Sequence, residues 1–176
     1  MEQFEKRFKI DCSPVAIEKQ TIVKGTTRLT VITPSMLRVE NQADRKFCDE
    51  PTQSVWFRDF CECGFEIKEN KGVVEIKTEK ATFVYSLRSK KMLRILLADG
   101  RKVTNYKAGN LKGTSRTLDI TAIDKVGDGV CSRNGVAVLD DSETLAIKPD
   151  GTILPRDNRE TDEYYFAYGN DYIGAT

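Results

Sequence analysis

Glycine turns at short intervals between alternating segments constrain this chain more than any other feature of its sequence. Asp99-Gly100, Asn134-Gly135 and Asp150-Gly151 each adjoin a run in which apolar and polar residues alternate, the usual signature of a β-hairpin. No run of ten or more residues before residue 169 has the spacing of an amphipathic helix. The sequence therefore predicts an all-β fold, closed most simply as a two-sheet β-sandwich.

The same pattern places the expected strands. Pro34 interrupts the first alternating segment and predicts a bend or bulge there, because proline donates no ladder hydrogen bond. Alternation on both sides of Asn70-Lys71-Gly72 predicts a hairpin with a three-residue turn. Segments with strand character lie at 26–41, 53–60, 65–78, 81–87, 92–103, 135–141, 145–155 and 163–169. No internal repeat divides them, and 176 residues suit a single domain.

Charge and composition exclude several classes of partner and chemistry. The 28 basic and 27 acidic side chains are interspersed and leave a net charge of +1, so we expect neither nucleic acid nor an anionic membrane as a partner. The sequence has no histidine, which excludes Ser-His and Cys-His nucleophile pairs and histidine-ligated metals within the chain. No apolar run is long enough to span a membrane.

The cysteines are odd in number and irregularly spaced: Cys12, Cys48, Cys61, Cys63 and Cys131. Cys61-Glu62-Cys63 has no second close pair that would complete a zinc cluster. We therefore expect free thiols, no bound metal and no cofactor. The N-terminal segment lacks the apolar core of a signal peptide, and free thiols are typical of the cytoplasm, so a cytoplasmic location is predicted.

The segment 104–134 lacks alternation and lies between two predicted hairpins. Loops of this length inside compact domains are usually functional or disordered. It carries Arg116, Asp119 and Arg133, and arginine forks and carboxylates both bind sugar hydroxyls, so these residues suit a sugar-contacting loop. An Arg116–Asp119 ion pair that merely ties the loop to the sheets is the alternative.

Two further groups of residues have a structural and a functional interpretation. A glycosidase needs two carboxylates about 5–10 Å apart, whereas the neighbours Asp140 and Asp141 would point to opposite faces of a strand. Both suit turn formation instead. Trp56, Phe57 and Phe60 would stack on a sugar ring if exposed, although packing in the core is the commoner role of such a cluster.

Four ordered stretches carry a family resemblance. They are KFCDEPTQSVWFRDF (46–60), NLKGTSRTLD (110–119), GDGVCSRNGVAVLDDS (127–142) and DEYYFAYGNDY (162–172). Together they resemble the N-terminal region of glycoside hydrolase family 31, which includes α-glucosidases and α-xylosidases, over about residues 22–172. Lys112 departs from the family's glycine, and Asn134-Gly135-Val136 stands where the family has Asp-Gly-Trp. Asparagine keeps the turn propensity of aspartate, so the hairpin should survive.

The resemblance implies a galactose-mutarotase-like β-sandwich over residues 1–170, with 171–176 as the start of a linker to a catalytic TIM barrel. It implies a retaining α-glycosidase, foremost an α-glucosidase, that acts on α-linked oligosaccharides. In such enzymes the catalytic carboxylates lie on the barrel, so none is expected in this chain. The apolar residues Tyr172 and Ile173 at the end of the sequence likewise suggest a chain cut before its next domain.

The resemblance also suggests substrate-binding residues: Arg116, Asp119 and Arg133 would either shape the rim of the barrel's pocket or lock the sandwich to the barrel. We favour locking, because a fixed geometry needs these charges to be paired. A barrel-facing surface exposed in the isolated sandwich would favour self-association into a homo-oligomer. A freestanding carbohydrate-binding module and a purely structural β-sandwich module remain the alternatives.

Overall fold

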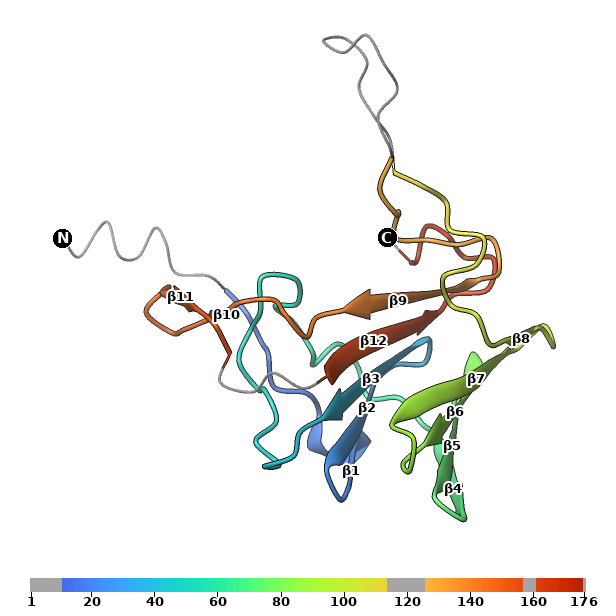
Figure 1. The fold of residues 1–176 in the computed structure, drawn as a ribbon, viewed down its shortest axis with the longest axis horizontal. Coiled ribbons are helices and arrows are strands. Elements are labelled where there is room, and N and C mark those ends of the chain that lie inside the picture. Colours follow the sequence, from blue (N-terminus) through green and yellow to red (C-terminus); the bar gives the residue numbers. More distant parts are fainter. Residues whose placement is uncertain (1–10, 114–125, 157–160, 176) are drawn as a thin grey trace, which may run out of the picture. The chain divides into compact units, whose positions relative to one another are not determined.

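The computed structural model describes residues 11–113, 126–156 and 161–175. Over these ranges the chain forms one short 3-10 helix, η1 (Glu18–Gln20), and β-strands joined by turns (Figure 1). The strands are β1 (Thr21–Lys24), β2 (Thr27–Thr33), β3 (Met36–Asn41), β4 (Glu66–Asn70), β5 (Val73–Lys77), β6 (Ala81–Ser86), β7 (Lys91–Leu97), β8 (Lys102–Val103), β9 (Val136–Asp140), β10 (Ala146–Ile147), β11 (Ile153–Leu154) and β12 (Thr161–Ala167). The predicted all-β class is confirmed.

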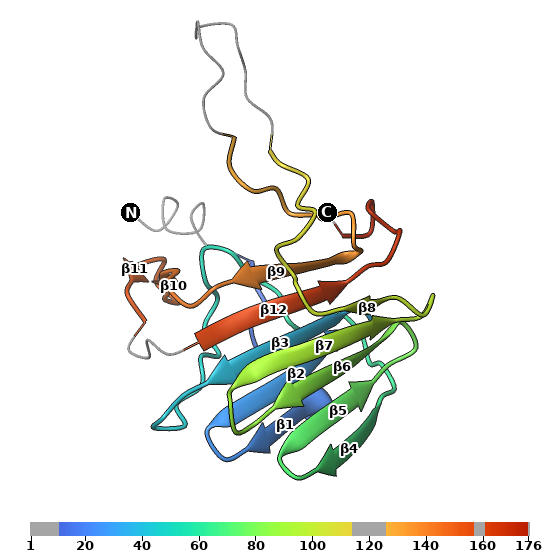
Figure 2. The ribbon, with the colours of Figure 1, turned by 45° about the vertical axis from the view of Figure 1, so that its right-hand side comes forward.

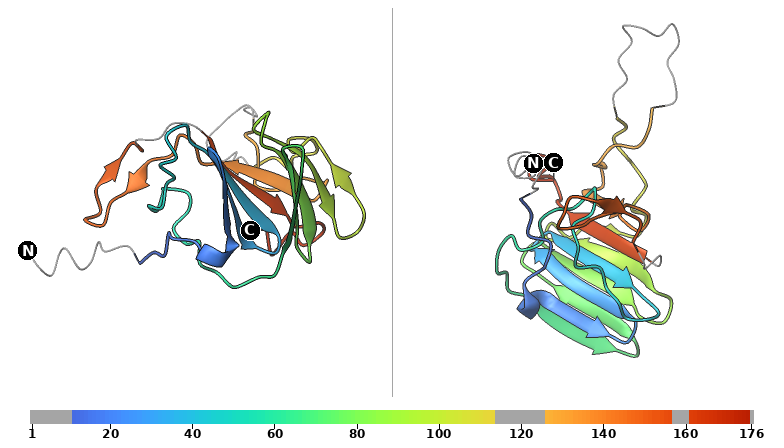
Figure 3. Two further views of the ribbon diagram at one scale, coloured as in Figure 1. Left: turned by 90° about the horizontal axis from the view of Figure 1, so that it is seen from below. Right: turned by 90° about the vertical axis from the view of Figure 1, so that its left-hand side faces the viewer.

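The strands form two main sheets and a small one. One five-stranded sheet has the order β1-β2-β3-β12-β9, and the other has the order β4-β5-β6-β7-β8. β10 and β11 pair as a separate two-stranded sheet (Figure 3). Two main sheets are what the β-sandwich prediction requires.

The chain divides into two compact units. The first unit comprises residues 1–64 and 140–164, and the second comprises residues 65–139 and 165–176. The boundary at residue 164 falls inside β12, so this strand contributes residues to both units. The proposed limits of the domain, 1–170 and 171–176, stay a prediction.

In the second unit, β4 to β8 follow one another as an antiparallel meander (Figure 2). One apolar side chain from each of β5, β6, β7 and β8 lies opposite the next, in the row Ile76, Phe83, Ile95 and Val103. All four side chains are buried. The alternation seen in the sequence thus builds one buried face of this sheet.

In the first unit, β2 and β3 form a hairpin whose two faces are both buried. Leu29 opposes Val39 on one face, and Arg28 opposes Glu40 on the other. Pro34 lies in the turn between the strands, where its fixed φ is tolerated, and a register shift interrupts the pairing between Val31 and Thr33. The predicted irregularity at Pro34 is therefore a hairpin turn with a bulge beside it.

Two other details differ from the sequence prediction. The β4–β5 turn has two residues, because Asn70 pairs directly with Val73 and Lys71 joins Gly72 in the left-handed region at φ 49° and 78°. Residues 53–60 form no strand; the chain there makes one isolated bridge, between Ser13 and Phe57. None of the helices in the described ranges has the length and hydropathy needed to cross a membrane.

Candidate functional site

Five charged side chains of the first unit, four of them buried and one nearly so, form what we call the charged cluster. They come from β2, β3, β12 and the segment before β12, and they are Arg28, Arg38, Glu40, Arg156 and Asp162. The side chain of Arg28 is 11% exposed, and the other four are at most 4% exposed. Charges buried to this degree persist only when they are paired and hydrogen-bonded.

Paired hydrogen bonds hold the charged cluster together. Arg38 donates from Nε to Asp162 Oδ1 at 2.9 Å and from Nη2 to Asp162 Oδ2 at 2.7 Å, a bidentate geometry. Arg156 Nη1 donates to the same Oδ2 at 2.7 Å. Glu40 accepts from Arg28 Nε at 2.5 Å, and its Oε1 lies 3.1 Å from Arg38 Nη2. Each carboxylate therefore faces two guanidinium groups.

The pKa directions follow from the balance between burial and this pairing, and at Glu40 burial prevails and raises the pKa. Burial acts to raise the pKa of Asp162, but the hydrogen bonds from Arg38 and Arg156 outweigh burial and hold that pKa below its ordinary value. Burial acts to lower the pKa of Arg38, and the hydrogen bond to Asp162 reverses this and raises it. Burial also raises the pKa of Tyr164, whose ring lies 5.4 Å from the Arg38 guanidinium. Asp162 and Arg38 are consequently both charged at neutral pH.

The segment that follows β3 covers the charged cluster. The carbonyl of Cys48 accepts from Arg28 Nη2 at 3.1 Å and from Arg38 Nη2 at 3.0 Å, while its amide donates to Glu40 Oε1 at 3.2 Å. The Arg28 guanidinium also lies 4.8 Å from the centre of the Phe47 ring. An alternating strand normally turns its polar side chains toward water. This cover converts the polar face of β3 into a second, ionic core.

Two further buried contacts join segments far apart in the sequence. Thr52 Oγ1 lies 3.1 Å from Asp141 Oδ1 and 2.8 Å from Asp141 Oδ2, and both residues are fully buried. Arg58 Nε donates to the Tyr164 hydroxyl at 2.7 Å. The stretch 46–60 is thereby fixed to the stretches that end at 142 and begin at 162.

In the second unit, the described ends of the long loop run side by side. Asn110 forms an antiparallel bridge with Ser132, and Leu111 N donates to the Cys131 carbonyl at 2.8 Å. The side-chain amide of Asn110 bonds both the amide and the carbonyl of Gly129, each at 2.9 Å. The base of the loop is therefore a short ladder fixed by one asparagine side chain.

Tyr168, just after β12, attaches this ladder to the end of β12. Its hydroxyl donates to the Ser132 carbonyl at 2.7 Å and accepts from the Ser132 amide at 2.5 Å. Gly169 N donates to the Gly135 carbonyl at 2.9 Å. A Cβ on Gly135 would lie 2.5 Å from the Gly169 oxygen, so only glycine permits this approach.

Of the predicted substrate-binding residues, the structure places only one. Arg116 and Asp119 lie outside the described residues. Arg133 is exposed in the turn after the ladder, where its amide donates to the Gly109 carbonyl at 2.8 Å. Its guanidinium is paired with none of the carboxylates in the described ranges. The rim and locking roles of these residues stay predictions.

The other candidate groups are now placed. Trp56, Phe57 and Phe60 are 42%, 43% and 59% exposed, so the expected packing of these rings in the core is wrong. Asp140 caps a turn by accepting from the Ser142 amide at 3.1 Å, as predicted. Asp141 also holds the turn, because its carboxylate accepts a hydrogen bond from the Thr144 hydroxyl, but unlike Asp140 it is fully buried and contacts Thr52.

The described residues offer scaffolding chemistry rather than acid–base chemistry in these clusters. Glu40, Asp141 and Asp162 are buried and already accept hydrogen bonds from arginine or threonine, so none is poised to exchange a proton with a substrate. The described ranges contain no group of three or more cysteine and carboxylate side chains placed to hold a metal ion. All five cysteines are free.

Sequence reasoning missed the charged cluster because its members look like ordinary surface residues of alternating strands. One signal was present: Arg38 and Glu40 stand two apart in a predicted strand, and Asp162 directly precedes the last predicted strand. Charges of opposite sign on separate strands suit a buried pair, but only the strand order shows that β3 and β12 are neighbours.

Comparison with known proteins gives structural neighbours only. No protein-family model matches the chain, and no curated protein matches it. A GH31 α-xylosidase from Xanthomonas citri is 19% identical, with 74% of this chain and 15% of that chain covered and a TM-score of 0.37. A Flavobacterium johnsoniae GH31 dextranase is 16% identical, with 93% and 27% covered and a TM-score of 0.42. This chain thus spans a small part of the length of either protein.

We predict that Asp162→Asn destabilises the protein by about 3–5 kcal/mol at neutral pH, because it leaves buried guanidinium groups without their counter-charge. The lowered pKa of Asp162 adds a pH dependence. Its contribution to stability is fully present above the unfolded-state pKa of about 4 and is lost as pH falls through the lower folded-state pKa. Urea unfolding at pH 7 and at stepwise lower pH measures both effects.

Glu143→Gln is the matched control for Asp162→Asn, because it removes one negative charge from an exposed site of the same unit. It should change the unfolding free energy by less than about 0.5 kcal/mol. Equal losses in the two variants would show that net charge, and not the buried pair, sets the stability.

A second prediction compares two glycines that share a left-handed backbone. Gly135 has φ 80° and Gly151 has φ 85°, but only Gly135 faces backbone atoms at contact distance, whereas the space around Gly151 is open. Gly151→Ala should cost about 1–2 kcal/mol from backbone strain alone. Gly135→Ala should cost about 1–3 kcal/mol more because the methyl group overpacks against Gly169. Thermal unfolding of both variants tests this, and similar melting temperatures would contradict the close approach.

Proposed function

We propose that this chain is the N-terminal β domain of a family 31 glycoside hydrolase. The parent protein would be a retaining α-glycosidase, foremost an α-glucosidase, that acts on α-linked oligosaccharides. Its catalytic carboxylates would lie on a barrel domain outside this sequence. The domain itself is non-catalytic in this proposal and supports the barrel.

One observation carries the proposal: the four stretches that resemble the family are brought together by contacts between their own residues. Thr52 of the first stretch bonds Asp141 of the third, and Arg58 of the first bonds Tyr164 of the fourth. Asn110 of the second bonds Gly129 of the third. A chance match of short sequences would give no reason for these particular side chains to meet, whereas a shared fold would.

Contacts between the third and fourth stretches extend the same pattern. Ser132 bonds Tyr168, and Gly135 lies against Gly169. The departure at Asn134 also fits, because its side-chain amide donates to the carbonyls of Asn105 and Ala108 at 3.0 and 3.1 Å. Both bonds need amide hydrogens, which asparagine has and aspartate lacks. This departure from the family's sequence is therefore compatible with the turn.

The long loop is the part of the domain that would reach the barrel in this proposal. Its base is rigid, since the ladder of residues 109–113 with 127–133 is fixed to Tyr168. Arg133 is exposed at that base. We place Arg116, Asp119 and Arg133 at the contact with the barrel, in the locking role first and the rim role second. Free thiols fit a cytoplasmic enzyme.

The direct test is hydrolysis of an aryl α-glucoside and an aryl α-xyloside. The 176-residue chain and the product of the complete reading frame, extended past Thr176 where it continues, are assayed side by side. We expect turnover only by the longer protein, with the sugar preference read from the same assay. A longer protein that is inert on all α-glycosides would reject the proposal and favour a carbohydrate-binding or structural module.

The locking role predicts a contrast between two contexts for Arg133→Ala. In the 176-residue chain the loss of this exposed side chain should change the free energy of unfolding by less than about 0.5 kcal/mol. In the longer protein the same change should lower the melting temperature with KM unchanged, because it removes a contact with the barrel. Arg88→Ala, at an exposed turn of the same unit, is the control and should change neither the stability of the 176-residue chain nor the melting temperature of the longer protein. A raised KM at unchanged melting temperature would favour the rim role instead.

A further inference from the structure

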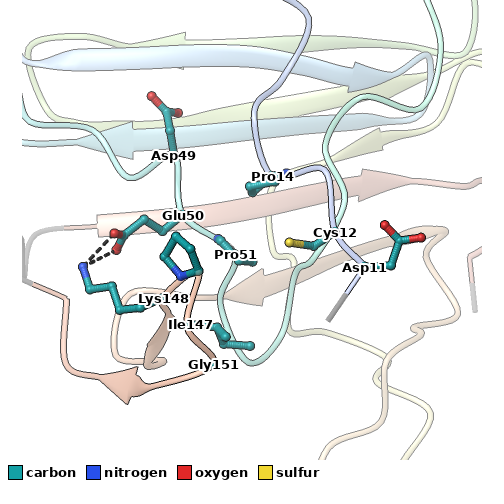
Figure 4. A pocket seen from close by; sticks show the side chains of 10 residues that line it. Asp11, Cys12, Pro14, Asp49, Glu50, Pro51, Ile147, Lys148 and Gly151 are labelled. Atoms are coloured by element: carbon teal, nitrogen blue, oxygen red, sulfur yellow. Dashed lines mark hydrogen bonds and ion pairs between the residues drawn. The ribbon is translucent and has the colours of Figure 1, made fainter. Parts of the chain in front are cut away.

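A pocket of about 400 Å³ opens in the first unit (Figure 4). The residues that line it are not those whose contacts join the four stretches that resemble family 31. Three segments form its walls: the chain entering from Asp11, the segment 49–51 and the β10–β11 hairpin. The lining residues are Asp11, Cys12, Pro14, Asp49, Glu50, Pro51, Ile147, Lys148, Pro149 and Gly151. Sites for small ligands typically have volumes of roughly 300–1,000 Å³.

The walls are fixed to one another by backbone hydrogen bonds and one arginine. Ile147 N donates to the Pro51 carbonyl at 2.8 Å, which seats the hairpin on the segment 49–51. Arg58, itself buried, donates from Nη1 to the carbonyls of Pro14 and Glu50, each at 2.9 Å. One guanidinium thus clamps two of the three walls, and the pocket is preformed. A preformed site binds with less loss of conformational entropy.

The floor and the edge of the pocket differ in chemistry. Figure 4 shows Pro14, Pro51 and Cys12 toward its middle and Glu50 with Lys148 at one side. Lys148 Nζ donates to both carboxylate oxygens of Glu50, at 2.6 and 2.9 Å, and the two side chains are 34% and 41% exposed. A hydrogen-bond donor and an acceptor therefore stand side by side at the edge of an apolar surface.

This arrangement matches a sugar ring better than other small ligands. A vicinal diol both donates and accepts, so it can bond a carboxylate and an ammonium group that are neighbours. The C–H face of the ring would lie on the proline rings. An anion fits poorly, because the ammonium of Lys148 is already paired with the carboxylate of Glu50, and Asp11 adds a further negative charge. The described part of the chain has no cluster of three or more cysteine or carboxylate side chains that could hold a metal ion.

We propose that this pocket binds a glucosyl unit of an α-linked oligosaccharide, with Glu50 and Lys148 as the residues that bond its hydroxyls. The choice of an α-glucosyl ligand rests on the function proposed above, while the diol chemistry rests on the pocket itself. Arg58 is a positioning residue, since it holds the walls and does not line the pocket.

Protection of Cys12 from alkylation tests the proposal on the 176-residue chain. Cys12 lines the pocket, whereas Cys61 is exposed outside it, so Cys61 is an internal control in the same sample. The chain is labelled with iodoacetamide in the presence of maltose, or of betaine at equal osmolality, and the labelling of each cysteine is measured by peptide mass spectrometry. At a maltose concentration of about nine times Kd, Cys12 labelling should slow about tenfold, because about a tenth of the sites are empty. Cys61 labelling should not change.

Two double variants make the test specific. Glu50→Gln with Lys148→Met removes the charged donor and acceptor and should abolish the protection. Glu79→Gln with Lys80→Met makes the same substitutions at exposed positions of the second unit and should leave the protection intact. Saturation-transfer NMR of maltose is the second measurement, and its signal should be lost only in the Glu50/Lys148 variant.

The outcomes separate this inference from the proposed function. Absence of both Cys12 protection and saturation transfer overturns the pocket, even if the longer protein hydrolyses α-glucosides. Protection that is equal in both double variants also overturns it, because the binding would then lie elsewhere. Protection lost only in the Glu50/Lys148 variant supports the pocket, even if the longer protein proves inert.

Discussion

The bidentate pair between Arg38 on β3 and Asp162 on β12 is the interaction on which the first unit depends. It joins residues 124 positions apart. A slip of two residues would return apolar side chains to the same face of the sheet, but it would break a two-point bond between a guanidinium and a carboxylate. Both groups are almost fully buried, so water cannot replace either partner if the strands shift. The pair therefore determines which strands are neighbours as well as how strongly they are held. Glu40, Arg28 and Arg156 add further paired charges on the same polar face.

The fold class and most hairpins could be predicted from the sequence, because turn chemistry and alternation are local. Asp99-Gly100 and Asp150-Gly151 turn the chain where expected, and Gly100 and Gly151 take positive φ values. The exposed rings of Trp56, Phe57 and Phe60 were not predictable, since nothing local distinguishes an aromatic side chain in the core from one on an irregular surface segment. The charged cluster was missed for a related reason: its meaning depends on the pairing of β3 with β12, and sequence alternation says nothing about which strands adjoin.

The two kinds of candidate site differ in what their chemistry permits. The carboxylates of the charged cluster are surrounded by guanidinium groups and have no lone pair to offer a ligand at low energetic cost. Glu50 and Lys148 are also paired, but they are partly exposed, so a ligand can enter their hydrogen-bond network without removing a charge from its partner. The same ion-pair chemistry thus serves rigidity where water is excluded and recognition where it is admitted. Arg58 connects the two regions, since it bonds Tyr164 on one side and the pocket walls on the other.

β12 contributes residues to both compact units, which has a consequence for how the chain reaches its fold. Asp162 and Tyr164 complete the first unit, and Tyr168, just past the end of the strand, anchors the ladder of the second. During synthesis on the ribosome, the β4–β8 meander can pair as soon as it emerges, because its contacts are local. The order β1-β2-β3-β12-β9 cannot close until the last strand has been made. Until then Arg38 lacks Asp162, its bidentate partner, and this nascent sheet depends on the arrival of its final strand.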